Sequence, residues 1–167
     1  MEYDHAKQRL IQAWGTLGSS WGVNRTMAQI HALLMISPEP LSADEVMEEL
    51  NISRGNANMN IRALIDWGMV YKEFKPGERR EYFRSEKDVW DLARQVARER
   101  RKRELEPILK ALNEVSKVEG ADSEKVKEMN KMVKDLKEFA EKSDGLLDKF
   151  IKSDEHWFFG NILKLIK

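Results

Sequence analysis

Residues 53–85 read SRGNANMNIRALIDWGMVYKEFKPGERREYFRS, and this stretch decides the fold. Its first half predicts a helix with an apolar side made of Ala57, Ile61, Leu64 and Ile65. Ser53 can cap the start of that helix, and Gly68 stands after its end, where a left-handed residue is favoured. Two short runs rich in aromatic residues then flank Pro76-Gly77, a pair suited to a tight turn because proline presets φ and glycine permits positive φ. The stretch therefore predicts a helix followed by a β-hairpin.

The residues before this stretch predict two more helices and a minimal strand. Asn24 can cap a helix over 25–36, whose inward side chains would be Met27, Ile30, Leu33 and Leu34. Leu41 can form a very short strand, and Ser42 with Glu45 forms a capping box for a helix that ends near Asn51. The order helix, helix, capped helix and hairpin is that of a winged helix-turn-helix, with the helix from Ser53 in the recognition position.

Both ends of the chain predict further helices. The first covers about 4–20, and a long helix starts near Asp88 and is kinked or broken by Pro107. A turn at Glu119-Gly120-Ala121 separates it from a helix capped by Asp122 or Ser123. Apolar residues there repeat at alternating steps of three and four, which is a seam for packing on another helix, either of the same chain or across a dimer: Val126, Met129, Val133, Leu136 and Ala140.

Ser143-Asp144-Gly145 should interrupt that helix, and an apolar final segment after it should be buried. We expect a mainly α-helical protein with a small β-hairpin wing. Its predicted divisions are an N-terminal dimerisation helix (1–24), a winged helix-turn-helix domain (25–87) and a long helix with a C-terminal helical dimerisation region (88–167).

The predicted outward face of the helix after Ser53 is the main functional signal. It carries Gly55, Asn56, Asn58, Met59, Asn60 and Arg62, with no acidic residue before Asp66. Asparagine is a poor helix former, but its amide can donate to phosphate or pair with adenine. The hairpin tip adds basic residues that suit phosphates or the minor groove. The candidate DNA-binding residues are Ser53, Arg54, Gly55, Asn56, Asn58, Met59, Asn60, Arg62, Lys75, Arg79 and Arg80.

Composition limits the other possibilities. The net charge is zero, so DNA binding has to rest on local charge. Cysteine is absent, and we find no nucleophile–base pair, metal-ligand cluster or phosphate-binding loop, so we expect no enzyme and no cofactor. His5, His31 and His156 are taken as structural or surface residues. No signal peptide or membrane span is evident, and we expect a cytoplasmic protein that does not bind membranes.

Several of these segments together resemble the GbsR-type branch of the MarR-like regulators, over about Gly15 to Pro107. The segments that carry the resemblance are Ile52 to Asn56, Met59 to Arg62, Trp67 to Val70, Gly77 to Phe83, Asp88 to Trp90 and Glu99 to Pro107. The resemblance implies a homodimer joined by terminal helices, with one recognition helix of each protomer in the major groove. It also implies control by a small molecule in some members. We name no effector, because the five tryptophans do not map onto an aromatic cage.

Two functions remain open from the sequence. The first is sequence-specific binding of double-stranded DNA by a homodimer that regulates transcription. The second is a winged-helix protein-interaction or scaffold module, which the zero net charge favours.

Overall fold

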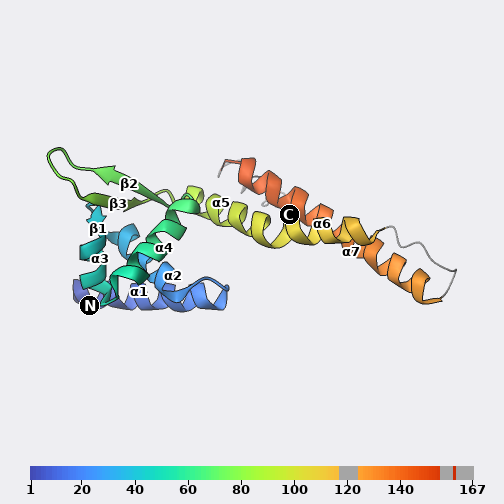
Figure 1. Ribbon diagram of the computed structural model, residues 1–167, viewed down its shortest axis with the longest axis horizontal. Helices are drawn as coiled ribbons and strands as arrows, with labels where there is room; N and C mark the ends of the chain where they lie inside the picture. The colour runs from blue at the N-terminus through green and yellow to red at the C-terminus, as the bar shows by residue number, and fades with distance from the viewer. Residues whose placement is uncertain (117–123, 155–159, 161–167) are drawn as a thin grey trace. The chain divides into compact units, whose positions relative to one another are not determined.

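The computed structural model describes residues 1–116, 124–154 and 160 (Figure 1). The chain divides into two compact units, Met1–Leu92 and Ala93–Lys167. The predicted turn at Glu119-Gly120-Ala121, the cap at Asp122 or Ser123 and most of the apolar final segment lie outside the described residues. His156 and Trp157 lie outside them as well.

The first unit has the predicted winged helix-turn-helix order, preceded by one helix. Its elements are α1 (Tyr3–Ser20), α2 (Arg25–Ile36), β1 (Leu41–Ser42), α3 (Ala43–Leu50), α4 (Arg54–Asp66), β2 (Val70–Phe74) and β3 (Glu81–Ser85), followed by the start of α5 (Val89–Arg100). The predicted mainly helical fold with a small β-hairpin wing is confirmed, including the minimal strand at Leu41.

Local caps begin α3 and α4 and set the short turn between these helices. The Ser42 backbone N–H donates to Glu45 Oε2 at 2.7 Å, and the Glu45 N–H donates to Ser42 Oγ at 3.3 Å, which is the predicted capping box. Asn51 ends α3 in the left-handed region, with φ 50°. Ser53 Oγ then accepts from the Asn56 N–H at 3.3 Å and starts α4. Three residues therefore suffice to redirect the chain from one helix into the next.

The hairpin forms part of a three-stranded antiparallel sheet in the order β1-β3-β2. Val70 pairs with Ser85 and Phe74 with Glu81, so the loop between the strands contains Pro76-Gly77, where Gly77 has φ 82°. On its other edge β3 pairs with β1, through Leu41 opposite Phe83. This second pairing fastens the wing to the segment that precedes α3.

Apolar side chains from α2, α3, α4 and β2 meet in one core. The fully buried large side chains include Ile30, Leu33, Leu34, Val46, Ile61, Leu64 and Val70. With Met27 and Ala57, these residues confirm the predicted inward faces of α2 and α4, except that Ile65 is only half-buried. Burial of this apolar surface is the main force that holds α4 in place.

Two glycines let α1 lie close along α2. A Cβ atom at Gly18 would come within 2.6 Å of the Ala28 Cβ, and one at Gly15 within 2.7 Å of the Gln29 Cγ. Real Cβ atoms do not approach so closely, so any larger residue at Gly18 would push the two helices apart. These two glycines therefore allow the close packing of α1 on α2.

The second unit is helical wherever it is described. The end of α5 continues into a π-helical turn, η1 (Arg101–Leu105), then α6 (Glu106–Val115), and after the undescribed stretch α7 (Glu124–Lys152). Pro107 lies in the first turn of α6. Since proline has no N–H to donate and its ring crowds the preceding turn, the wider turn at η1 agrees with the predicted break in the long helix.

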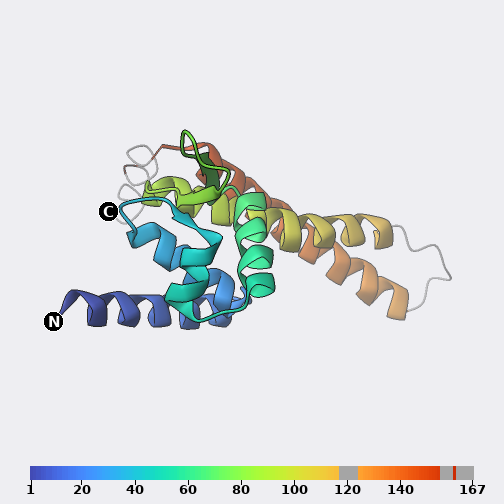
Figure 2. The same ribbon diagram turned by 60° about the vertical axis from the view of Figure 1, so that its left-hand side comes forward.

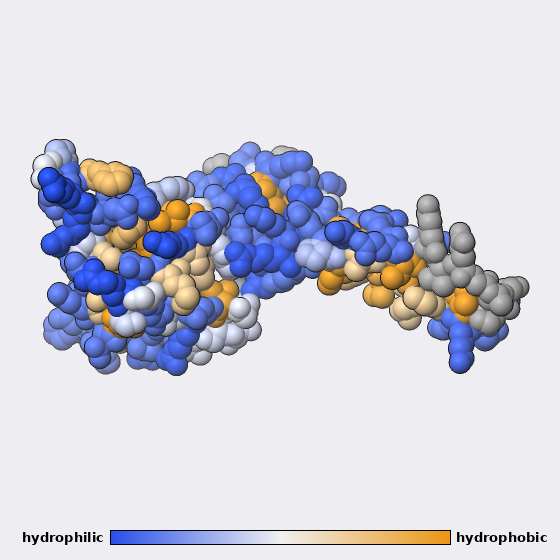
Figure 3. Space-filling view, viewed as in Figure 1, coloured by the Kyte–Doolittle hydropathy of each residue, from blue (hydrophilic) through white to orange (hydrophobic). Residues whose placement is uncertain are grey.

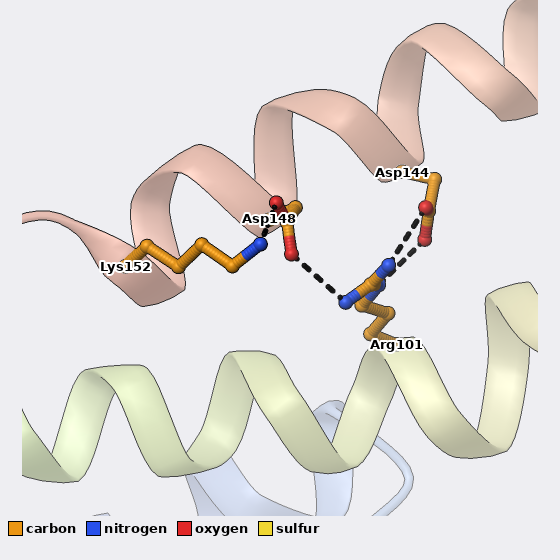
Figure 4. A network of polar contacts seen from close by, with 4 residues as sticks. All are labelled: Arg101, Asp144, Asp148 and Lys152. Atoms are coloured by element: carbon orange, nitrogen blue, oxygen red, sulfur yellow. Dashed lines mark hydrogen bonds and ion pairs between the residues drawn. The ribbon is translucent and has the colours of Figure 1, made fainter.

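A cluster of ion pairs joins η1 to α7 (Figure 4). The Arg101 guanidinium donates to both Asp144 carboxylate oxygens, at 2.6 and 2.8 Å, and to Asp148 Oδ1 at 3.2 Å. Lys152 Nζ donates to Asp148 Oδ2 at 2.7 Å. The predicted interruption at Ser143-Asp144-Gly145 is wrong, because α7 runs unbroken through it. Asp144 is a poor helix former, but here its carboxylate has a bidentate partner on the neighbouring helix.

Only part of the predicted seam on α7 is covered within the chain. Val133 and Ala140 are buried, since α7 packs on α6 and η1. Met129 and Leu136 are exposed, and they belong to a second stripe whose side chains are 44% to 71% exposed: Met129, Met132, Leu136, Phe139 and Leu146. Figure 3 shows apolar surface along the part of this unit formed by α6 and α7. No helix among the described residues is both long and apolar enough to span a membrane.

Candidate nucleic-acid interface

One face of α4 lies at the surface of the first unit (Figures 1 and 2). Arg54, Gly55 and Arg62 are exposed, and Met59 is 61% exposed. Asn56 and Asn58 are half-exposed at the edges of the same face. The opposite side of the helix packs in the core. The predicted outward placement is therefore confirmed for Gly55, Asn56, Asn58, Met59 and Arg62, and Arg54 lies exposed beside them.

The start of α4 combines a capping hydroxyl, a basic side chain and an open glycine. Ser53 is the cap, and Arg54 Nη2 lies 2.9 Å from Asp44 Oδ1 on α3 in a solvent-exposed ion pair. Such a pair contributes little to stability, so Arg54 can exchange its partner for another anion at small cost. A Cβ atom at Gly55 would meet nothing within 4 Å, and its φ is not positive. The fold itself therefore does not require glycine at this position.

Asn60 does not lie where the sequence predicted. It is only 3% exposed, although we expected it at the edge of the outward face. Its Nδ2 donates to the Asn56 backbone oxygen at 2.8 Å and to Asn56 Oδ1 at 2.7 Å. Because these two bonds satisfy its amino group inside the helix, Asn60 can be buried and cannot itself reach a ligand. The helical wheel left it at the boundary between the two faces, and only packing decided the side.

Basic residues of the wing differ in how tightly they are held. Lys75 Nζ lies 4.0 Å from the centroid of the Tyr82 ring, a cation–π contact, and the Tyr82 hydroxyl donates to Glu78. Arg79 and Arg80 are exposed in the loop. Hydrogen bonds from Ser42, with smaller contributions from the charges of Lys75 and Arg80, lower the pKa of Glu45. The tip therefore keeps two exposed arginines while Lys75 is anchored at its base.

Ion pairs between β2 and β3 neutralise charged side chains of the wing strands. Lys72 Nζ lies 2.8 Å from Glu81 Oε1, and Arg84 Nε lies 3.5 Å from Glu73 Oε2. Phe74, at the end of β2, is 66% exposed beside this basic tip. The sequence analysis did not select Phe74 as a site residue. Its place in the alternating pattern, outward and next to Lys75, was the signal that could have identified it.

A buried histidine lies elsewhere in the first unit and takes no part in this face. His31 is 3% exposed, and its Nδ1 accepts from Trp14 Nε1 at 3.3 Å. Its Nε2 has no hydrogen-bond partner among the described residues. Desolvation lowers the pKa of His31 to about 4, so the ring is neutral at pH 7. The expected structural role of His31 agrees with this burial, and within the described part of the chain no acidic or histidine cluster suits a metal ion.

Comparison with known proteins supports the regulator assignment. Residues 21–81 match the model of the MarR family. Over these residues the chain is similar to MarR-family proteins. The matched region contains α2, α3, α4 and most of the wing, which are the elements that position the exposed face.

Two longer similarities extend beyond the MarR-family region. The chain is 21% identical over 168 residues to the HTH-type transcriptional repressor OpcR of Bacillus subtilis (strain 168), covering 91% of this chain and 87% of OpcR. A solved structure described as a transcriptional regulator has the same fold, with a TM-score of 0.59 and 20% identity over 86% of this chain and 99% of that one. These relatives are described as regulators of transcription, in agreement with the expectation that the chain is not an enzyme.

Proposed function

We propose that this protein is a sequence-specific, double-stranded DNA-binding transcriptional regulator that acts as a homodimer. The observation that carries the proposal is the exposed face of α4, which offers Arg54, Arg62 and asparagine amides with no acidic residue before Asp66. In a winged helix-turn-helix the helix in this position enters the major groove. A face rich in hydrogen-bond donors matches the acceptors of base edges and phosphates there.

Gly55 supports this placement independently. Glycine in a helix costs roughly 0.5–1 kcal/mol relative to alanine, and nothing within the chain requires it here. A missing side chain beside the free N–H groups of the helix start lets a phosphate approach the backbone closely. We infer that α4 meets the DNA backbone near Gly55, with Ser53 and Arg54 beside it.

The wing would contact the same duplex beside α4. Arg79 and Arg80 are exposed and suit phosphates or the minor groove, and Lys75 would act from the base of the loop. Arg54 would leave Asp44 for a phosphate. These contacts are local, which is how a chain of zero net charge can bind a polyanion.

The exposed stripe on α7 supports the homodimer. Its five residues recur at steps of three, four, three and seven, which is a coiled-coil seam. Exposed apolar patches of this kind mark interaction sites, and a second copy of the helix offers the complementary seam. On α1 a weaker stripe of Tyr3, Leu10 and Leu17 is exposed at steps of seven and can share the interface.

We place the protein in the GbsR-type branch on the motifs given above, and its control by a small molecule remains part of the proposal, with no effector named. As a cytoplasmic regulator it would bind pseudo-palindromic operators whose half-sites lie about one helical turn apart, near 10 base pairs.

Selection from a pool of randomised duplexes tests the proposal. The full-length protein should enrich a pseudo-palindrome, and its affinity should fall steeply from about 50 to about 200 mM salt. Arg62→Ala should cost roughly 1–3 kcal/mol and relax one base pair per half-site if Arg62 reads a base. Arg9→Ala is the matched control, because Arg9 is exposed on α1, away from α4 and the wing.

Failure to enrich any duplex at low salt, from a folded dimer, would contradict the proposal and favour the protein-interaction or scaffold module. A uniform loss with Arg62→Ala would place that residue on phosphate. No loss would remove Arg62 from the interface.

A further inference from the structure

Asn60 forms a buried link to the candidate DNA-binding face. Its side chain is 3% exposed, and its amino group donates to two oxygens of Asn56, the backbone oxygen at 2.8 Å and Oδ1 at 2.7 Å. The Asn56 backbone N–H is fixed as well, by Ser53 Oγ at 3.3 Å. The backbone and the amide oxygen of Asn56 are therefore both held from within the first unit.

This contact determines which half of the Asn56 amide is available. An asparagine amide has one acceptor oxygen and one NH₂ donor group. The Oδ1 atom of Asn56 accepts a hydrogen bond from Asn60 Nδ2, which takes one of its two lone pairs, while no hydrogen bond of Asn56 Nδ2 is seen among the described residues. Turning the amide over would set its NH₂ against the NH₂ of Asn60 and leave a buried donor without a partner, which is costly.

We propose that Asn60 is a positioning residue, which holds the Asn56 amide so that Asn56 presents a hydrogen-bond donor to duplex DNA and recognises an acceptor. The inference rests on the proposed function, since it concerns how the same face of α4 reads a duplex. Such a donor can meet phosphate oxygens or the major-groove acceptors N7 and O6 of guanine, N7 of adenine and O4 of thymine. Among the bases, guanine alone presents two acceptors side by side, which suits the two N–H bonds of one NH₂ group.

The consequence for base recognition differs from the one drawn from the sequence. Bidentate pairing of asparagine with adenine needs the amide oxygen to accept from N6 while the NH₂ donates to N7. Because Asn60 fixes the amide and takes one of the two lone pairs of this oxygen, Asn56 accepts from adenine N6 less readily than it donates from its free NH₂ group. The Asn58 side chain makes no such hydrogen bond among the described residues, so the restriction concerns Asn56.

The test compares wild type with Asn60→Leu, Asn56→Ala and the double variant in the full-length protein. Leucine has the same branching and the same number of side-chain heavy atoms as asparagine and suits a buried site, but it cannot donate, so the Asn56 amide becomes free to turn. The probe is a pool of duplexes randomised over about 20 base pairs, enough for two half-sites one turn apart. Asn113→Leu, the same change on the exposed face of α6, is the matched control.

If Asn56 reads a base, wild type should enrich guanine at one position per half-site, and Asn60→Leu should admit adenine there. If Asn56 binds a phosphate, Asn60→Leu should weaken all duplexes by roughly threefold to tenfold, the effect of one hydrogen bond, without changing the motif. In both cases the effect of Asn60→Leu should vanish in the Asn56→Ala background. A merely structural role of Asn60 would persist in that background.

Three outcomes overturn the inference. Unchanged affinity and motif in Asn60→Leu, or the same loss with and without Asn56, would refute it while leaving DNA binding intact. No enrichment by wild type would overturn the proposed function together with the inference. If Asn60→Leu does not fold, side-chain amide NMR of Asn56→Ala decides: the Asn60 NH₂ resonances should shift and exchange faster, and unchanged resonances would refute the link.

Discussion

The two units of this chain differ in how completely they bury their apolar side chains. The first unit closes a core in which Ile30, Leu33 and Val46 have no exposed surface, and it leaves a polar face on α4 outside. The second unit buries Val133 and Ala140 but leaves the five-residue apolar stripe of α7 in solvent. Several helices and a sheet can enclose a core, whereas a pair of helices can cover only one stripe of each. Among the described residues, the first unit therefore buries its apolar side chains within the chain, whereas the second leaves uncovered the stripe on which the proposed dimer rests.

The strongest test of this contrast makes the same change, leucine to alanine, once in each unit. Leu33→Ala should cost roughly 2–5 kcal/mol of folding free energy, because it leaves a cavity in a closed core. Leu136→Ala, where the side chain is 47% exposed, should cost less than about 1 kcal/mol in dilute monomer. Urea unfolding of both variants measures the difference. Sedimentation should show that Leu136→Ala weakens self-association, and equal folding costs would contradict the contrast.

As the pH falls, folding stability should be lost first in the first unit, through protonation of buried His31. The folded pKa of His31, about 4, lies below its unfolded value near 6.5, so the native state binds fewer protons than the unfolded state between these limits. The stability that this difference supplies is complete above about pH 6.5 and is lost as pH falls towards 4, a change of about 3 kcal/mol. Urea unfolding from pH 7 to pH 4 should show this slope in wild type.

His31→Gln should remove most of that slope, whereas His5→Gln, at an exposed position on α1, should keep it. An unchanged slope in His31→Gln would assign the acid sensitivity to other groups.

The ion pairs of the second unit should respond at lower pH. The hydrogen bonds from Arg101 hold the pKa of Asp144 below its usual range. Its contribution is therefore present above the unfolded pKa, near 4, and is lost as pH falls through the lower folded value. Asp144→Asn should cost about 1–2 kcal/mol at pH 7, since the pair is bidentate but partly exposed.

Helix content of Asp144→Asn followed by circular dichroism during thermal unfolding measures this cost. Asp135→Asn is the control, an exposed carboxylate on the same helix. A loss of equal size at a pH well below the folded pKa of Asp144 would show that the charge is not responsible.

The smallest expected effect concerns Lys87, which follows the wing. Its Nζ donates to the backbone oxygens of Leu34, Met35 and Ser37 at 3.0, 2.6 and 2.8 Å, the free carbonyls at the end of α2. Lys87→Met should cost about 1 kcal/mol, because much of the side chain is exposed and water can replace the ammonium. Lys102→Met in η1 should cost nothing measurable in the same thermal unfolding assay.

The elements of the first unit were predictable because each has a local cause. The Ser42–Glu45 capping box, the Ser53 cap and Gly77 act within a few residues, and the apolar periodicity of α2 and α4 specifies their buried sides. For the same reason the exposed positions of Arg54, Met59 and Arg62 could be predicted. Their contacts with DNA stay a prediction.

The predictions that were wrong concern residues whose placement depends on contacts outside the local sequence pattern. Ser143-Asp144-Gly145 contains weak helix formers, but the bond between Asp144 and Arg101 joins residues distant in sequence and supports a continuous helix. Asn60 lies at a boundary of the helical wheel, and its burial depends on a bond to Asn56 that periodicity does not encode. The seam of α7 divides into a covered and an uncovered stripe only when α6 occupies one side.

The sequence by itself determined the order of helices and hairpin, their caps and the apolar sides of α2 and α4, because caps, turns and periodicity are local properties of the chain. Tertiary structure alone decided that Asn60 points inward to hold Asn56, that Arg101 ties η1 to α7, and that one apolar stripe of α7 stays open. Each of these depends on which side chains meet in space, and the free energy of burial or pairing is realised only after they have met.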